Sequence, residues 1–280
     1  MIYNRITKKT FSPADSVLDY FWLCGDEKNP PLLFLPGYTG THKDLVEMAE
    51  SLKKNYFVLI PDLPGWGDSQ PLYQRLTLEA YSDYLDKLIK FVGMKNIIVC
   101  GHCMGATLGI ELAYKYPDKV KELFLISTPY IHNTLSEALF LHLADLSERS
   151  PRPLKSFFFL WRARVFSVPL SFFILKFHSL RKLLRITFKT AFSQSRQDEK
   201  AVEENWISLI HFDYKKIAHL AMPVNLIYGE EDLIIGKKQA YKLHDLIPDS
   251  KLYFIPHSGH LPPVETPKAL ASYIAKSIIN

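Results

Sequence analysis

Five residues near the middle of the chain have the types and the spacing that covalent catalysis needs. They read Gly101-His102-Cys103-Met104-Gly105, directly after the apolar run Ile97-Ile98-Val99-Cys100. A nucleophile on a sharp turn between a strand and a helix needs small neighbours two positions away, so that strand and helix can approach each other. The next backbone N–H, at the helix N-terminus, then points at a developing oxyanion. The pattern predicts acyl chemistry with Cys103 as the attacking group.

Two partners for this cysteine lie downstream. Asp232 closely follows the strand-like run Met222–Tyr228, and His260 follows the strand-like run Lys251–Pro256. A carboxylate can orient a histidine, and the histidine can take the proton of the thiol as a general base or hold it in an ion pair. We therefore predict that Cys103, Asp232 and His260 form a catalytic triad.

Alternating strands and helices are expected to position these residues. Strand-like runs are found at Val17–Cys24, Leu32–Leu35, Phe57–Ile60, Ile97–Cys100 and Val120–Ser127, and helical spacing at His42–Lys54, Leu78–Val92 and Met104–Tyr116. This alternation predicts an α/β fold, with a mostly parallel central sheet and helices on both faces. In such sheets the chemistry lies at the carboxyl ends of the strands. From 131 to 219 the alternation stops, and this interval is predicted to be largely helical.

Five segments together resemble the α/β-hydrolase superfamily, in its esterase, thioesterase and C–C hydrolase branch. They are the cysteine turn, the loops of Asp232 and His260, and the strand–loop segments Leu32–Gly40 and Asn55–Ser69. The resemblance covers about residues 15–130 and 220–280, and it implies an α/β-hydrolase fold with its core in 1–130 and 220–280. It also implies that 131–219 is an inserted helical cap, or lid, over the active site.

The resemblance selects among competing acids and bases. The family places its acid three residues after the glycine that ends the strand, which favours Asp232 over Glu230 and Glu231. The family's final loop matches the segment around His260 rather than His257.

The resemblance also implies how an oxyanion and a substrate would be held. It assigns the oxyanion hole to the backbone N–H groups of Tyr38 and Met104. The residues expected to contact substrate are Tyr38, His102 and Leu261. Of these, His102 lies inside the cysteine turn and is expected to pack beside the nucleophile without doing chemistry itself.

Two positions depart from the family's pattern. Pro36-Gly37 stands where the family usually has His-Gly, which affects the handling of substrate more than catalysis, because the oxyanion donors are backbone groups. Cys103 stands where serine is usual, and in this it resembles dienelactone hydrolases and polyhydroxyalkanoate synthases. Three other interpretations of Cys103 stay open: a buried, inert cysteine, half of a thioredoxin-like redox pair with Cys100, or a replacement for a serine.

The composition is that of one globular enzyme domain. The chain has 280 residues, 48% of them hydrophobic and 22% charged, which is enough for a single large core. Three cysteines, Cys24, Cys100 and Cys103, together with an N-terminus that lacks an apolar signal core, predict a reducing, cytoplasmic location. The histidines and cysteines lack metal-ligand spacing, so we expect no metal and no other cofactor. No apolar run reaches the roughly 20 residues of a membrane span.

A basic and aromatic segment, 149–197, lies inside the predicted cap. It contains 11 Lys or Arg residues, no Asp or Glu, and ten aromatic residues, and the net charge of +5 on the chain originates there. One interpretation is a cap helix with a solvated basic edge, and another is peripheral docking on an anionic membrane. The remaining interpretations are binding of nucleic acid and binding of an acidic substrate, such as an acyl-CoA or a phospholipid. We expect no nucleic acid among the partners.

The combined pattern predicts a hydrolase of carboxylic esters or thioesters that acts through an acyl-Cys103 intermediate. The expected substrates are small apolar esters, thioesters or lactones, because the aromatic-rich cap favours an apolar acyl group. An acyltransferase that passes the acyl group to an alcohol or amine is the alternative. A second alternative is a non-catalytic small-molecule binding protein on the same fold. The sequence indicates no particular oligomeric state.

Overall fold

The computed structural model describes residues 2–13, 17–38, 40–72, 74–130, 198–247 and 249–277. These residues form one eight-stranded sheet in the order β1-β2-β4-β3-β5-β6-β7-β8. The strands are β1 (Ile2–Phe11), β2 (Asp19–Asp26), β3 (Pro31–Leu35), β4 (Phe57–Pro61), β5 (Ile97–His102), β6 (Val120–Ile126), β7 (Val224–Gly229) and β8 (Lys251–Ile255). Only the β1–β2 and β2–β4 pairs are antiparallel among these strands. The predicted, mostly parallel sheet is confirmed.

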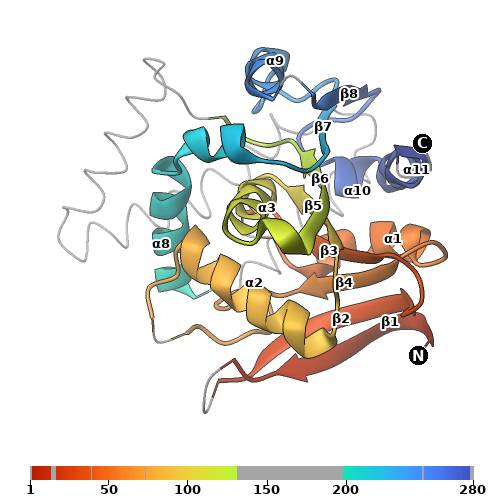
Figure 1. Cartoon of the computed structure of the whole chain (residues 1–280), viewed down its shortest axis with the longest axis vertical. Coiled ribbons are helices and arrows are strands. Elements are labelled where there is room, and N and C mark those ends of the chain that lie inside the picture. Colours follow the sequence, from red (N-terminus) through yellow and green to blue (C-terminus); the bar gives the residue numbers. More distant parts are fainter. Residues whose placement is uncertain are drawn as a thin grey trace, which may run out of the picture.

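Helices cover both faces of this sheet (Figure 1). They are α1 (His42–Leu52), α2 (Leu78–Val92), α3 (Met104–Lys115), η1 (Pro117–Lys119), α8 (Glu199–Ile210), η4 (Tyr214–His219), α9 (Lys237–Leu246), α10 (Pro262–Glu265) and α11 (Pro267–Ser277). Buried side chains of α2 and α3 share one core with Leu33 and Leu35 of β3. Side chains of α1 and α11 share the other core with Leu32 and Phe34. Since neighbouring side chains of a strand point to opposite faces, β3 contributes to both cores, and the predicted layers are confirmed.

Helix α2 spans the residues that the sequence predicts, and its local sequence explains where it begins and ends. The side chain of Thr77 caps its start by accepting a hydrogen bond from the Ala80 N–H at 3.1 Å. The apolar positions Tyr81, Leu85 and Leu88 are fully buried and lie on one face. Gly93 ends the helix in the left-handed conformation, with φ of 79°, which glycine adopts without steric cost.

Strand β1 is one of the elements that the sequence does not predict, as are helices α9 and α11. It lies at one edge of the described sheet and pairs with β2 alone. Its side chains from Asn4 to Thr10 are exposed or half-buried, so they show no apolar alternation that would indicate a strand. Backbone pairing with β2, which no local pattern reports, therefore determines the conformation of this segment.

Part of the predicted cap interval, 131–219, falls within the described residues. Helices α8 and η4 lie in it, and the apolar side chains Ala201, Val202 and Leu209 of α8 join the core that α2 and α3 build. The basic segment 149–197 lies outside the described residues, so its docking on a membrane stays a prediction. Over the described part of the chain, no helix combines the length and the apolar character that crossing a membrane would require.

Candidate active site

Cys103 lies on a strained turn between β5 and α3. Its backbone has φ of 50° and ψ of −115°, a conformation that residues other than glycine rarely adopt and that costs on the order of 1–3 kcal/mol. A backbone hydrogen bond to the neighbouring strand holds the turn: the Cys103 N–H donates to the carbonyl of Ile126 on β6 at 2.8 Å. The cysteine is half-buried, whereas the strand before it and α3 from Met104 to Ala113 are buried.

The two glycines of the pentapeptide are required because other backbone atoms lie where a larger residue would have its Cβ atom. A Cβ atom on Gly101 would overlap the carbonyl of Gly105, and a Cβ atom on Gly105 would overlap the carbonyls of Leu35 and Pro36. The elbow therefore packs against the end of β3 and the loop that follows it. A Cβ atom on Gly37 of that loop would lie 3.4 Å from the Cβ atom of Cys103.

His260 and Asp232 meet at this elbow. His260 Nδ1 lies 2.9 Å from Asp232 Oδ2, and both side chains are buried. The other carboxylate oxygen of Asp232 accepts the backbone N–H groups of Ile234 and Ile235, each at 2.8 Å, which fixes the direction of the carboxylate. The Cys103 side chain is close enough to the His260 ring to raise its pKa. The structure thus brings the three predicted catalytic side chains together.

The contacts of His260 favour its protonated form. Burial lowers the pKa of His260, but hydrogen bonds to Asp232 and to Cys103 outweigh burial and raise the pKa from 6.5 to about 10. We therefore expect the ring of His260 to be an imidazolium at neutral pH.

The competing residues His257 and Glu230 lie at the surface, away from the contact between His260 and Asp232. The side chain of His257 is 76% exposed, and its Nδ1 lies 3.7 Å from Glu231. Glu230 is exposed and pairs with Lys237 at 3.3 Å.

His102 holds the backbone of His260. Its Nε2 lies 2.8 Å from the His260 carbonyl. Burial, followed by the charge of the His260 ring, lowers the pKa of His102 to about 3. A neutral His102 therefore donates this hydrogen bond through Nε2–H. Its predicted contact with substrate stays a prediction, as does that of Leu261, a half-buried residue next to His260.

Glu265 holds the same loop from the other side, and the sequence analysis did not identify it. Its two carboxylate oxygens accept the backbone N–H groups of Gly259 and Leu261, at 2.8 and 2.9 Å, which flank His260. The signal in the sequence is its position, five residues after His260, where it ends the short helix α10.

Replacing Glu265 by Gln is expected to lower kcat about 10- to 100-fold, because an amide can accept only through its oxygen and the His260 loop would shift. The measurement is the steady-state rate on the best ester, together with thermal unfolding. Asp26→Asn is the matched control: Asp26 also accepts a backbone N–H, from Lys28 at 3.0 Å, in the turn after β2. If Glu265→Gln kept the full rate, the loop would not need this carboxylate.

The two predicted oxyanion donors lie beside the elbow. Met104 is the first residue of α3, so its N–H has no intrahelical acceptor. Tyr38 follows Gly37, where an added Cβ atom would overlap the His102 ring of the elbow. The assignment of these two N–H groups to an oxyanion hole stays a prediction.

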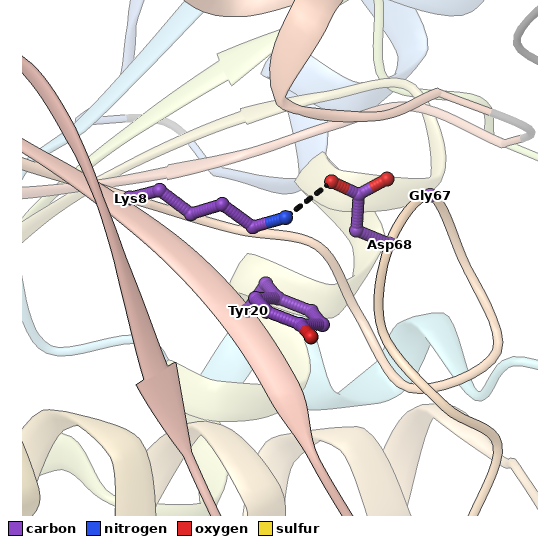
Figure 2. A pocket seen from close by; sticks show the side chains of 4 residues that line it. All are labelled: Lys8, Tyr20, Gly67 and Asp68. Atoms are coloured by element: carbon purple, nitrogen blue, oxygen red, sulfur yellow. Dashed lines mark hydrogen bonds and ion pairs between the residues drawn. The ribbon is translucent and has the colours of Figure 1, made fainter.

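The loop after β4 brings an aromatic side chain to Tyr38. Asp62 anchors this loop by accepting the backbone N–H of Asp68 at 2.9 Å, and Lys8 of β1 pairs with Asp68 at 2.6 Å beside the ring of Tyr20, as Figure 2 shows. The anchored loop carries Trp66, whose ring meets that of Tyr38 edge-on with centroids 5.7 Å apart. The polar hollow of Figure 2 therefore contains an ion pair that supports the loop.

Within the described ranges, no group of three or more His, Cys, Asp or Glu side chains is arranged to hold a metal ion. The acids and histidines described in this site instead contact one another, lysine side chains or backbone groups.

Comparison with known proteins gives consistent matches. A family model described as "alpha/beta hydrolase fold" matches residues 30–267. Lipase 3 of Moraxella sp. (strain TA144) is 27% identical over 252 residues, which are 86% of this chain and 75% of that protein. Lipase 1 of Psychrobacter immobilis is 28% identical over 252 residues, 86% of this chain and 74% of that protein. The solved structure of a thermophilic esterase from Thermogutta terrifontis has a TM-score of 0.75 at 22% identity and covers 98% of each chain.

Proposed function

The chain belongs to the α/β-hydrolase fold family, and we propose that it cleaves carboxylic esters or thioesters with an apolar acyl group through an acyl-Cys103 intermediate. The observation that carries this proposal is the pair of contacts made by His260, with Asp232 on one side and with Cys103 on the other. The relatives named lipase support ester substrates.

Acylation would begin from a thiolate and an imidazolium. The Cys103 sulfur attacks the carbonyl carbon, a C–S bond forms, and the carbonyl oxygen becomes an oxyanion. The N–H groups of Tyr38 and Met104 would stabilise this oxyanion, an effect of about 3 kcal/mol per donor in comparable sites. His260 then gives its proton to the leaving oxygen or sulfur as the bond to the carbonyl carbon breaks.

Deacylation would use the neutral imidazole that remains. His260 takes a proton from water, the resulting hydroxide equivalent attacks the thioester carbonyl, and the thiolate leaves with a carboxylic acid as product. The acyltransferase alternative differs only in this step, where an alcohol or amine replaces water. The alternative of a binding protein predicts that neither step occurs.

The test is a screen of chromogenic esters and thioesters of increasing acyl length, with and without added alcohol. Longer apolar chains should be cleaved faster, and intact-mass analysis after rapid quenching should find one acyl group attached at Cys103. Formation of a new ester in the presence of alcohol at the expense of free acid would favour acyl transfer. Absence of both turnover and an adduct across the series would contradict the proposed function.

His260 is expected to keep its proton well above neutral pH. Although burial lowers the pKa of His260, hydrogen bonds with Asp232 and Cys103 bring it to about 10. Replacing Cys103 by Ala removes one of these contributions, so the pKa of His260 should fall. Because the imidazolium is the acid in acylation, the acylation rate of the unmodified enzyme should fall as pH rises through about 10.

The measurement is an NMR titration of the His260 ring in the unmodified protein and in Cys103→Ala, with His260→Ala identifying the resonance. Identical titration of His260 in both proteins would contradict its hydrogen bond with the thiol.

A further inference from the structure

Helix α8 contacts the side chain of Tyr38 at two places. The hydroxyl of Tyr38 donates to the carbonyl of Val202 at 3.1 Å, and the ring of Tyr38 contacts that of Trp206 with centroids 5.5 Å apart. Both partners belong to α8, which is far away in the sequence. Tyr38 is adjacent to Gly37, where an added Cβ atom would overlap the His102 ring and lie 3.4 Å from the Cβ atom of Cys103. A helix from the predicted cap interval therefore reaches the loop at the elbow.

The ring of Tyr38 also contacts an aromatic side chain of the core, Trp66. Trp66 contacts the Tyr38 ring edge-on and is itself almost completely buried. Its Nε1–H donates to the hydroxyl of Tyr81 at 2.7 Å, and that hydroxyl donates to the carbonyl of Pro64 at 2.8 Å. Tyr38 therefore contacts both this fixed ring of the core and α8.

Helix α8 is fastened to the core by contacts that do not involve Tyr38. These hydrogen bonds run from the N–H of Leu76 to Glu204 at 2.7 Å, from the N–H of Leu78 to the Ser208 hydroxyl at 2.9 Å, and from the Asn205 amide to the Tyr81 hydroxyl at 2.8 Å. In Figure 1 α8 lies beside the first turn of α2, where two of these bonds are made. The helix therefore stays docked if any one of them is removed.

We propose that α8 is a positioning element of the reaction: through the side chain of Tyr38 it sets the backbone N–H of Tyr38 in the oxyanion site. This inference rests on the proposed function. The oxyanion exists only in the transition state and the tetrahedral intermediate, so a displaced donor weakens transition-state binding and leaves substrate binding almost unchanged. Contacts on α8 thus influence kcat although they do not touch the reacting atoms.

The test compares Tyr38→Phe with Ser208→Ala. Each removes one hydrogen bond between α8 and the rest of the protein, at 3.1 and 2.9 Å, but only the first concerns the loop at the elbow. Tyr38→Phe should lower kcat about 10-fold with little change in KM, because a donor is displaced rather than removed. A trifluoromethyl ketone analogue of the best ester should bind more weakly by the same factor. In Ser208→Ala, kcat and the affinity for the ketone should each stay within about twofold of the values for the unmodified enzyme.

A second variant, Trp206→Leu, removes the ring contact and keeps the hydroxyl, and it should also lower kcat and ketone affinity together. Equal losses in Tyr38→Phe and Ser208→Ala would overturn the proposal, since general loosening of α8 would then suffice. An unchanged kcat in Tyr38→Phe, with normal turnover by the unmodified enzyme, would overturn this inference alone. An unmodified enzyme that neither cleaves esters nor forms the Cys103 adduct would overturn the proposed function itself.

Discussion

Replacing Cys103 by Ala is expected to abolish ester cleavage, with kcat falling by a factor of about 10⁴ or more, as for loss of a nucleophile in comparable triads. The elbow places this side chain beside His260, and alanine offers no atom that could form the covalent bond. The measurement is the steady-state rate on the best ester from the screen, with thermal unfolding to show that the fold is kept. A retained rate would contradict nucleophilic catalysis by Cys103.

Alkylation tests the same role in the unmodified protein. Iodoacetamide near neutral pH should label Cys103 well ahead of Cys24 and Cys100, which are 1% and 0% exposed. Burial raises the pKa of Cys24 to about 12 and that of Cys100 well above its usual range, so both stay as unreactive thiols. Activity should decline in step with labelling. Cys103→Ser is the informative control, because a faster serine enzyme would favour the interpretation that cysteine replaced a serine here.

Asp232→Asn is expected to lower kcat by a factor of about 10⁴ while the fold is kept, because an asparagine stabilises the wrong tautomer and orientation of the histidine. His260→Ala should be at least as damaging, because the proton would then have no acceptor. Both effects should appear in acylation, which stopped-flow release of a chromogenic alcohol measures directly. Both substitutions should change the midpoint of thermal unfolding by only a few degrees.

Two control variants address the competing residues. His257→Ala and Glu230→Gln should be nearly neutral, because His257 is largely exposed and Glu230 pairs with Lys237 at the surface. A large defect in His257→Ala together with an active His260→Ala would mean that the wrong histidine was chosen.

The fold could be predicted where the local pattern is strong. Buried parallel strands are short apolar runs, and helices such as Leu78–Val92 carry a cap at each end, so both are visible in the sequence. Strand β1 could not be found this way, because it is polar and its conformation comes from pairing with β2. The basic segment 149–197 lies outside the described residues, and its interpretation as a membrane-docking surface stays a prediction.

Some residues of the candidate site could likewise be predicted from the sequence, and others could not. Residues such as Cys103 follow strands at fixed distances, so their positions could be predicted from strand–loop patterns. Glu265 and the partners of Tyr38 could not, because they act by accepting backbone N–H groups or by contacts across long stretches of sequence. The hydroxyl of Tyr38 reaches a carbonyl 164 residues away, and no local spacing indicates such a bond.

The order of strands in the sheet has a consequence for biosynthesis. Cys103 follows β5 near the centre of the sheet, whereas Asp232 and His260 follow β7 and β8, at the edge and late in the chain. At translation rates of about 5–20 residues per second, the thiol leaves the ribosome on the order of ten seconds before its base. During this interval His260 cannot yet activate the thiol, so we expect the triad to form only after β8 has joined the sheet.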